Sequence, residues 1–326
     1  MFFRQPRRLH CLRFLTKEKM NKYSIFPIQY PEYWDAYKKQ QHAFWTAEEL
    51  DFTSDLDDWY HKLNDNERHF IIFVLAFFAQ SDGIVNENLA VRFYSDTDIA
   101  EVRAFYTAQM LIETVHAEVY GLLIETYVKD DEEKDKLFDA IQHYPVIAKK
   151  ADWALKWLNS DKSEAHRLVA FAIVEGLFFS GSFCAIFWLR KRGLMKGLAG
   201  ANDLIVRDEG LHADFPALRF EVEKFSLPEE DFHAILKEAV EIEKEFIQDA
   251  LPVRLIGMNE KLMCEYIEYT ADRLARRFSF SNIYNTANPF DFMNMIDIAT
   301  KTNFFESRVT DYKKAANTLL AFGADF

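Results

Sequence analysis

Glu113-Thr-Val-His116 and Glu209-Gly-Leu-His212 are two copies of one short motif, a glutamate followed three positions later by a histidine. Residues at i and i+3 lie on the same face of an α-helix. If both segments are helical, each motif points a carboxylate and an imidazole in one direction. Both side chains are common metal ligands, so each motif predicts part of a metal site.

A lone acidic residue precedes each motif by about the length of a helical hairpin. Asp82 lies 31 residues before Glu113, and Glu175 lies 34 residues before Glu209. Four helices would then bring four carboxylates and two imidazoles to one interior position. Such a set binds two first-row metal ions inside a helical bundle. The sequence therefore predicts a two-metal carboxylate site.

The composition favours long helices over sheets. Of 326 residues, 49% are hydrophobic, and only 10 are Gly and 8 are Pro, which is few for a fold with many turns. No alternating β pattern persists long enough to compete with the helical periodicity. We therefore expect an all-α, ferritin-like helical bundle with the two-metal site in its core. The expected helices span residues 66–95, 99–128, 131–143, 146–159, 162–192, 198–223, 229–250 and 259–278.

Three positions carry signals for the start of a helix. Asn64 and Asp98 are each followed three residues later by Glu, which is the spacing of an N-cap residue and its N3 partner. Thr46 begins TAEEL (46–50), which has the same capping-box pattern. We expect a helix to begin at each position.

Leu168–Leu189 is the most apolar segment, and its single ionisable residue is Glu175. Its length would allow it to cross a bilayer. We expect no second comparable stretch, and a lone glutamate in mid-membrane is costly, so a helix buried on all sides is favoured. An unpaired buried carboxylate is costly too, and Asp82 follows a similarly apolar run. Metal ions would supply the required cations; the alternative is ion pairs with arginines distant in sequence.

The predicted ligand set suits iron or manganese better than zinc, which prefers closed tetrahedral sets of nitrogen and sulfur. Two irons that react with O2 are the first choice, and manganese–iron or two manganese ions remain open. A third match to the motif, Glu230 with His233, follows Pro228 and has no inward carboxylate to accompany it. We interpret this third pair as surface.

Charge and cysteine content limit the partners and the compartment. The net charge is −13; residues 1–20 carry a local charge of about +5, so the remainder is about −18. An acidic chain of this kind is not expected to bind nucleic acid. The three cysteines, Cys11, Cys184 and Cys264, have no metal-binding spacing and an odd count. We expect a reduced, cytoplasmic environment.

The chain divides into three regions. Residues 1–20 form a basic extension, interpreted as sequence upstream of a natural start at Met20 or as an organellar transit segment. Residues 21–290 are expected to form the helical domain. Residues 291–326 lose helical periodicity and are expected to form a C-terminal tail.

Several longer motifs resemble the small subunit of class I ribonucleotide reductase, in its eukaryotic and viral type. The resemblance runs from about Phe26 to Phe326. The motifs are FWTAEELD (44–51), LAFFAQSDGIVNENL (75–89), IETVHAEVY (112–120), KKADWALKW (149–157), VEGLFFSGSF (174–183), KRGLM (191–195), RDEGLH (207–212), NPFDFM (288–293), KTNFFESRV (301–309) and the closing ADF.

The resemblance implies that six residues bind two metals and that Tyr120 is oxidised to a stable radical. The six are Asp82, Glu113, His116, Glu175, Glu209 and His212. The spacing agrees, because Tyr120 lies four residues after His116 and seven after Glu113, on nearly the same helical face. The resemblance also implies an apolar pocket around the radical, for which plain core packing is an equally good account. The pocket residues are Phe179, Phe183 and Ile205.

The resemblance further implies a path for an electron and a proton from His116 through Asp208 and Trp45 to Tyr312 in the tail. Two of these residues have another interpretation. Trp45 precedes the capping box and could pack on Leu50 as a hydrophobic staple. Asp208 could hold the His116 ring in one tautomer.

We therefore interpret the chain as a homodimeric radical-generating subunit that passes an oxidising equivalent to a separate large subunit, which reduces ribonucleotides. The tail ending at Phe326 is expected to dock on that subunit. No Gly-rich phosphate loop is present. A di-iron oxygenase or desaturase, and a non-catalytic iron-storage protein of ferritin type, are the alternatives. Both leave the tail unexplained.

Overall fold

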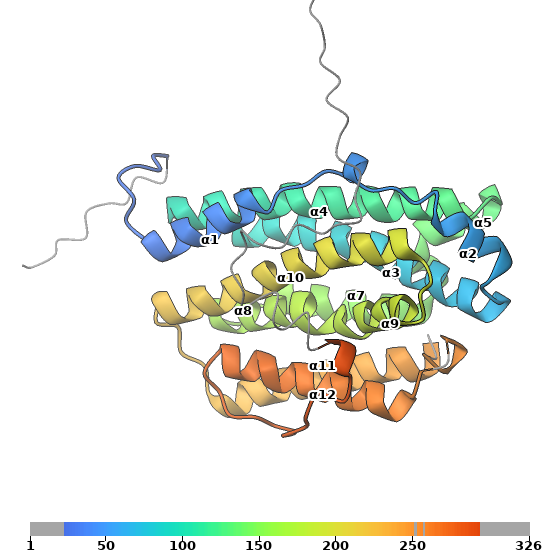
Figure 1. Cartoon of the computed structure of the whole chain (residues 1–326). Coiled ribbons are helices and arrows are strands. Elements are labelled where there is room, and N and C mark those ends of the chain that lie inside the picture. The colour runs from blue at the N-terminus through green and yellow to red at the C-terminus, as the bar shows by residue number, and fades with distance from the viewer. Residues whose placement is uncertain (1–22, 251–252, 257, 294–326) are drawn as a thin grey trace, which may run out of the picture.

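The computed structural model describes residues 23–250, 253–256 and 258–293, and regular secondary structure within them is entirely helical (Figure 1). The expectation of an all-α fold is confirmed. The α-helices are α1 (Pro31–His42), α2 (Asp55–His61), α3 (Asp65–Asn88), α4 (Ala100–Tyr127), α5 (Asp131–Phe138), α6 (Ala140–His143), α7 (Pro145–Leu158), α8 (Glu164–Ile173), α9 (Ser180–Lys191), α10 (Lys196–Val222), α11 (Glu229–Glu245) and α12 (Glu260–Arg277).

The axes of the longest helices are roughly aligned with one another, and the helices form layers (Figure 1). Helices α1, α3 and α4 pack together at one side, and α10 packs on α8 and α9 in the middle. Helices α11 and α12 pack on each other at the opposite side. The first and middle layers meet where α10 contacts α4. The predicted metal-binding residues lie on α3, α4, α10 and the segment that joins α8 to α9.

The helix caps follow the sequence signals only in part. The Asn64 side chain accepts a hydrogen bond from the Glu67 amide at 3.0 Å, and the Glu67 carboxylate accepts one from the Asn64 amide at 2.9 Å, so this box is confirmed. The Asp98 cap is wrong: the N-cap residue of α4 is Ile99. Glu101 instead accepts hydrogen bonds from the backbone amides of residues 29 and 30, which ties the chain before α1 to α4.

Thr46 begins only a three-residue 3-10 helix, η1 (Ala47–Glu49), rather than an α-helix. The capping box itself is confirmed, and in it the Glu49 carboxylate accepts a hydrogen bond from the Thr46 amide at 3.1 Å. Leu50 follows as the C-cap in extended conformation. Leu50 therefore lies at the end of this short helix and not within a longer one.

Three predicted helices are interrupted by π-helical turns. These are η2 (Leu89–Phe93) after α3, η3 (Val174–Phe178) between α8 and α9, and η4 (Phe246–Ala250) after α11. A π-turn contains one residue more than the corresponding α-turn, and such turns occur frequently at functional sites. The η3 turn contains Glu175. Hydrophobic periodicity alone did not predict any of the three.

Helix α10, which contains one Glu-x-x-His motif, begins at a tightly packed junction with α2. The Asp55 carboxylate accepts hydrogen bonds from the backbone amides of Gly197 and Leu198 at 2.8 and 2.7 Å, so it caps α10 from another helix. A Cβ atom at Gly197 would lie 2.8 Å from both the Asp51 carbonyl and the Asp55 carboxylate. Only glycine fits this contact.

The apolar Glu175 segment is buried, as expected. In Glu164–Lys191, 94% of the most apolar window lies inside the fold. The expectation that no second comparable stretch exists is wrong, because Asp65–Phe93 is also long and apolar enough to cross a membrane, with 56% of its window buried. Core helices of folded bundles share this composition.

Several predictions fall outside the described residues. They concern the basic extension 1–20, Cys11, and the tail from residue 294 onward, which includes Tyr312 and Phe326. Among the described cysteines, Cys184 is buried, Cys264 is half-buried, and both are free thiols.

Candidate metal centre

The six predicted metal-binding side chains meet in one buried cluster. They form two groups that share Glu113, and within each group one ligand atom per residue lies within 4.8 Å of the others. The first group is Asp82, Glu113 and His116, and the second is Glu113, Glu175, Glu209 and His212. All six are at most 4% exposed.

Two carboxylates span the two imidazoles. The oxygens of Glu113 lie 3.3 Å from His116 Nδ1 and 2.7 Å from His212 Nδ1. The oxygens of Glu209 lie 3.1 Å and 3.4 Å from the same two nitrogens. Asp82 belongs only to the first group and Glu175 only to the second. The cluster therefore has two ends joined by two central carboxylates.

Hydrogen bonds on the outer side of each imidazole leave Nδ1 directed inward. His116 Nε2 lies 3.3 Å from an Asp208 oxygen. His212 Nε2 lies 2.8 Å from the Gln40 amide, whose oxygen faces the ring because that orientation gives both amide atoms partners. With Nε2 directed outward, each Nδ1 faces the carboxylates and would offer its lone pair to a bound metal. This arrangement is typical of metal-binding histidines.

The acidic groups need cations that lysine and arginine do not provide. In the part of the chain that the structure describes, no Lys or Arg forms an ion pair with any of the six residues. Seven buried side-chain atoms in the cluster also have no hydrogen-bond partner. They belong to Asp82, Gln109, Glu113, His116, Glu175, Glu209 and His212. The alternative of compensating arginines therefore has no support among the described residues.

The directions of the pKa shifts also indicate that the buried carboxylates need positive charge nearby. Burial and the neighbouring carboxylates raise the pKa of Asp82 and Glu175 well above the ordinary range. Burial opposes ionisation of Glu113 too, but attraction to His212 and His116 holds its pKa well below the usual value. Burial lowers the pKa of His212, yet Glu113 raises it to about 9. Without metal, protons on the imidazoles supply the positive charge.

The donor set fits two divalent metal ions. Four ionised carboxylates and two neutral imidazoles together carry the charge that two divalent cations neutralise. Hard oxygen ligands with one nitrogen for each metal suit iron and manganese. The unpartnered carboxylate and Nδ1 atoms are the atoms that would bind them.

Gln109 was not predicted from the sequence. Its amide donates to Glu175 Oε1 at 2.9 Å and to Glu113 Oε1 at 3.4 Å, which orients two ligands of the second group. It precedes Glu113 by four residues on α4, so helical spacing could have identified it. Gln40, on α1, has no such spacing relation to either motif.

Tyr120 lies beside the cluster in aromatic surroundings. It is 3% exposed, and its ring stacks on Phe78 with centroids 4.8 Å apart. Burial, followed by the charge of Asp82, raises the pKa of Tyr120 well above 10, so the phenol keeps its proton at neutral pH. Phe78 also contacts the predicted pocket residues Phe179 and Phe183, at 5.7 and 4.9 Å between centroids.

Ile205, the third predicted pocket residue, is likewise buried. The residue missed in this region is Phe78, which touches Tyr120 directly. It precedes Asp82 by four residues, so the same helical spacing could have revealed it.

Trp45 and Asp208 form a hydrogen-bonded connection to His116. Trp45 Nε1 donates to Asp208 Oδ2 at 2.7 Å, the same oxygen that faces His116 Nε2. Arg207 donates to the other Asp208 oxygen at 2.9 and 3.0 Å. His116 and Arg207 hold the pKa of Asp208 below its usual value against the effect of burial. Asp208 therefore links the indole to the imidazole, and Tyr312 lies outside the described residues.

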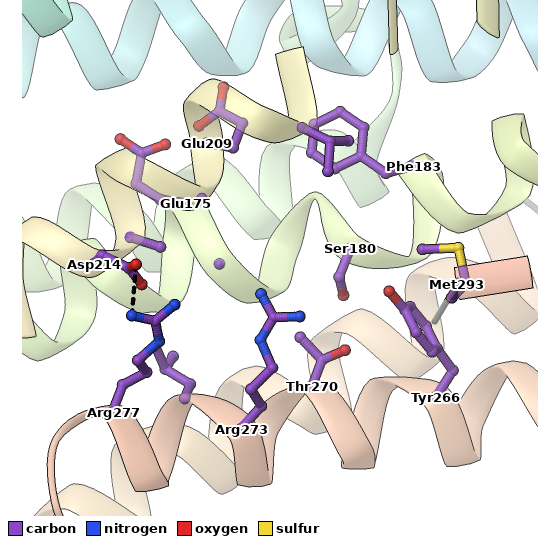
Figure 2. Close-up of a pocket in the computed structure, with 15 residues that line it drawn as sticks. Glu175, Ser180, Phe183, Glu209, Asp214, Tyr266, Thr270, Arg273, Arg277 and Met293 are labelled. Carbon is purple, nitrogen blue, oxygen red and sulfur yellow. Dashed lines mark ion pairs between the residues drawn. The ribbon is translucent and has the colours of Figure 1, made fainter. Parts of the chain in front are cut away.

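A pocket of about 80 Å³ opens onto the second group (Figure 2). Glu175 and Glu209 lie at its inner end, while Arg273 and Arg277 reach toward it from α12. Arg277 pairs with Asp214 at 2.5 Å. The volume is sufficient for a few molecules of the size of water. None of the residues found only in the first group lines this pocket.

The third Glu-x-x-His pair lies apart from the cluster, as predicted. Glu230 is exposed, and His233 is half-buried with Nε2 3.1 Å from the Ser281 carbonyl. Neither residue belongs to the two metal-binding groups found among the described residues.

The fold and the cluster define a ferritin-like helical protein with a buried cluster of carboxylates and histidines that could hold two metal ions. The family model described as "Ribonucleotide reductase, small chain" matches residues 22–289, and the chain belongs to that family. It is 55% identical over 300 residues to the ribonucleoside-diphosphate reductase small subunit of Dictyostelium discoideum, with 92% of this chain and 89% of that protein aligned. It is also 55% identical over 294 residues to the small subunit of the same enzyme from vaccinia virus (strain Copenhagen), with 90% and 92% aligned.

Solved structures agree. The ribonucleotide reductase Rnr4 homodimer of Saccharomyces cerevisiae matches with a TM-score of 0.77 and 36% identity, over 85% of this chain and 88% of that one. The dimanganese(II) NrdF of Streptococcus sanguinis has the same fold, with a TM-score of 0.75 and 20% identity, over 86% and 98%. The resemblance to the eukaryotic and viral type of small subunit is therefore confirmed.

Proposed function

We propose that this chain binds two metal ions, most simply two irons, and uses O2 to generate a radical on Tyr120 for a ribonucleotide-reducing large subunit. The observation that carries the proposal is the buried six-residue cluster with Tyr120 beside it, in a chain of the ribonucleotide reductase small-chain family. Family membership also argues against the oxygenase and iron-storage alternatives. Manganese–iron and two manganese ions remain compatible with the same ligands.

Each residue of the cluster has a definite task in this proposal. Asp82 and His116 would hold one ion, Glu175 and His212 the other, with Glu113 and Glu209 shared between them. Two ferrous ions held there would give electrons to O2, which is the oxidant that would remove an electron and a proton from the tyrosine. Because two ferrous ions and one tyrosine give three electrons, an external one-electron reductant such as excess ferrous iron would supply the fourth. Gln109 would keep the Glu175 and Glu113 carboxylates oriented.

The surroundings of Tyr120 suit a long-lived radical. The phenol is protonated at neutral pH, so its oxidation must release a proton, and nearby Asp82 is the first carboxylate that raises its pKa. Phe78, Phe179 and Phe183 surround this region with apolar rings that exclude water and reductants. We propose that Ile205 completes the pocket.

The contacts among Trp45, Asp208 and His116 support the proposed transfer path. The Trp45 indole N–H donates to Asp208, so a proton can move along the same contact by which the indole is electronically coupled to the imidazole. Arg207 fixes Asp208 from its other side. In this proposal Tyr312 continues the path, and the tail ending at Phe326 docks on the large subunit.

The Glu175 pocket is the proposed entrance to the site. It places a few water-sized volumes directly against Glu175 and Glu209. Gly176, Gly210 and Ala213 lie on its wall, where larger side chains would fill it. Metal ions and O2 would reach the cluster by this route (Figure 2).

Helix α4 offers a face for homodimer formation. Leu111 and Leu122 are 53% and 42% exposed, and Thr107, Thr114 and Glu118 continue the same exposed stripe. We propose that this stripe packs against a second copy of the protein. Replacing Leu111 and Leu122 with Glu should yield monomers in light scattering, and an unchanged mass would contradict the assignment.

Electron paramagnetic resonance tests the proposed function directly. Ferrous iron and then O2 are added to the metal-free wild-type protein and to Tyr120→Phe. We expect about two irons per chain in both proteins and a persistent neutral tyrosyl signal only in the wild type, because Phe has no phenolic proton to lose. A signal that persists in Tyr120→Phe would place the radical elsewhere.

A further inference from the structure

Lys150 and Glu243 form an ion pair in the apolar interior, away from the cluster. Lys150, on α7, is 3% exposed, and Glu243, on α11, is 0% exposed. Lys150 Nζ lies 2.5 Å from the Glu243 carboxylate. It also lies over the rings of Phe246 and Phe77, 3.6 and 4.1 Å from their centroids. Burial lowers the pKa of Lys150 to about 8 despite the attraction of Glu243.

A pair buried this deeply is not explained by stability alone. Desolvation of two charges offsets their mutual attraction, and apolar residues of similar volume are often as stable or more so. Among the described residues, neither Lys150 nor Glu243 forms an ion pair or hydrogen bond with any of the six cluster residues. Both residues instead contact backbone that lies outside the cluster.

That backbone is the end of the π-turn η3, the turn that contains Glu175. Lys150 Nζ donates to the carbonyl of Phe178, the last residue of η3, at 2.8 Å. Ser180 Oγ donates to the preceding carbonyl, that of Leu177, at 2.7 Å. Two consecutive carbonyl groups therefore accept from side chains at the point where the helical hydrogen-bond pattern changes from π to α.

Glu243 is packed against Gly181, the second residue of α9. A Cβ atom at position 181 would lie 2.7 Å from Glu243 Oε1. The carboxylate can approach this backbone so closely because residue 181 is glycine. The Gly181 amide also opposes the effect of burial on the pKa of Glu243. Lys150 thus binds the end of η3 by a hydrogen bond, and Glu243, which is paired with Lys150, packs against the start of α9.

We propose that Lys150 and Glu243 are positioning residues that lock the π-turn and thereby aim Glu175 at the second metal position. If η3 relaxed to α-helix, the register would change by one residue and side chains on one side of it would turn by about 100°. Such a rotation would remove Glu175 from the cluster. The inference rests on the proposed metal centre for its effect on metal binding, but its effect on the π-turn does not depend on metal.

The test compares a buried and an exposed pair on the same two helices. Lys150→Met combined with Glu243→Met replaces the charges with apolar side chains of similar length. Lys149→Met combined with Glu245→Met is the matched control, because this ion pair also joins α7 to α11 but both side chains are 46% exposed. Helix content and melting temperature are measured for each protein by circular dichroism.

Cobalt(II) chloride is the metal probe, titrated into metal-free protein with calorimetric and absorption detection. We expect the buried-pair variant to fold, to bind one Co(II) as the wild type does, and to bind the second ~10–100-fold more weakly, the range typical for residues that orient metal ligands. The control should bind both ions normally. Equal affinities at both positions in a folded buried-pair variant would overturn the proposal, as would equal weakening of both.

Hydrogen–deuterium exchange of the metal-free proteins gives a second, metal-independent readout. Amides of residues 177–182 should exchange at least ~10-fold faster in the buried-pair variant than in the control, because the π-turn would open locally. Unchanged exchange would contradict the locking role even if Co(II) binding were lost. If the wild type bound no Co(II), the proposed metal centre would fail while the exchange result still decided the role of the pair.

Should the double variant not fold, Glu243→Gln decides the question. This variant keeps the shape of the side chain but removes its charge, so the buried Lys150 loses its ion pair. It should weaken the second Co(II) and speed exchange of residues 177–182. Wild-type values for both measurements would refute the proposal.

Discussion

Glu175→Ala and Glu113→Ala should weaken metal binding to different extents, because the two residues occupy different places in the cluster. Glu175 belongs to one metal-binding group, whereas Glu113 belongs to both and faces both imidazoles. Loss of Glu175 should therefore weaken one position. Loss of Glu113 should weaken two.

The magnitude follows from the linkage between binding and stability. At a free metal concentration of 100 times Kd, each ion stabilises the fold by ~2.7 kcal/mol, so two ions contribute ~5.4 kcal/mol. Removing a direct ligand should cost at least the ~100-fold that marks the upper range for residues outside the ligand shell. At the same metal concentration such a position would contribute only ~0.4 kcal/mol. Glu175→Ala should thus lose ~2.3 kcal/mol and Glu113→Ala ~4.6 kcal/mol of metal-dependent stability.

Calorimetric melting with and without metal measures this difference, and subtracting the metal-free value removes any effect on the fold itself. At ~1.5 °C per kcal/mol for a chain of this size, the metal-induced shift should fall by about 3 °C in Glu175→Ala and about 7 °C in Glu113→Ala. Glu230→Ala is the control, because this glutamate is exposed and lies outside both groups. Equal losses in the two cluster variants would refute the shared role of Glu113.

Three further outcomes are expected. Gly197→Ala should destabilise the fold by ~1–3 kcal/mol in thermal melting, because its Cβ would lie 2.8 Å from the Asp55 carboxylate. Arg219→Met should cost ~3–5 kcal/mol by the same assay, because Arg219 is 1% exposed and its two carboxylate partners would lose their cation. In pull-down and nucleotide-reduction assays, deleting residues 320–326 should abolish docking on the large subunit, whereas Tyr312→Phe should keep docking and stop reduction.

Each outcome has a result that would contradict it. Wild-type melting temperatures for Gly197→Ala or Arg219→Met would show that those contacts add little. Full nucleotide reduction by the protein lacking residues 320–326 would show that the tail has been misinterpreted.

The sequence predicted the six-residue cluster because the spacing that places Glu and His on one helical face lies within a few residues of the chain. The i and i+3 spacing within a helix fixes that Glu113 and His116 share a face, whatever the helix packs against. Buried carboxylates without nearby cations are costly, so four of them in one bundle core indicate bound metal ions. Phe78 and Gln109 follow the same spacing rule, because each lies four residues before a predicted ligand, Asp82 or Glu113.

Other features depend on tertiary contacts that no local pattern contains. The Asp98 cap was wrong because the Glu101 carboxylate accepts hydrogen bonds from the backbone before α1. The spacing of Asp98 and Glu101 in the sequence does not predict this long-range contact. Gln40 reaches His212 from α1, across 172 residues of sequence. The π-turn at Glu175 accepts a hydrogen bond from Lys150, a residue of another helix. These interactions are decided by packing rather than by propensity.

The pocket beside Glu175 would give the two proposed metal positions different access from solvent, and therefore a different order of binding and release. Of the six cluster residues, only Glu175 and Glu209 line the opening, so an ion held by Asp82 and His116 would lie farther from it than an ion held by Glu175 and His212. If both ions enter through this pocket, the inner position would be occupied first, and the outer ion would then close the route to it. A chelator would meet the outer ion first, and the last ion to enter would be the first to leave.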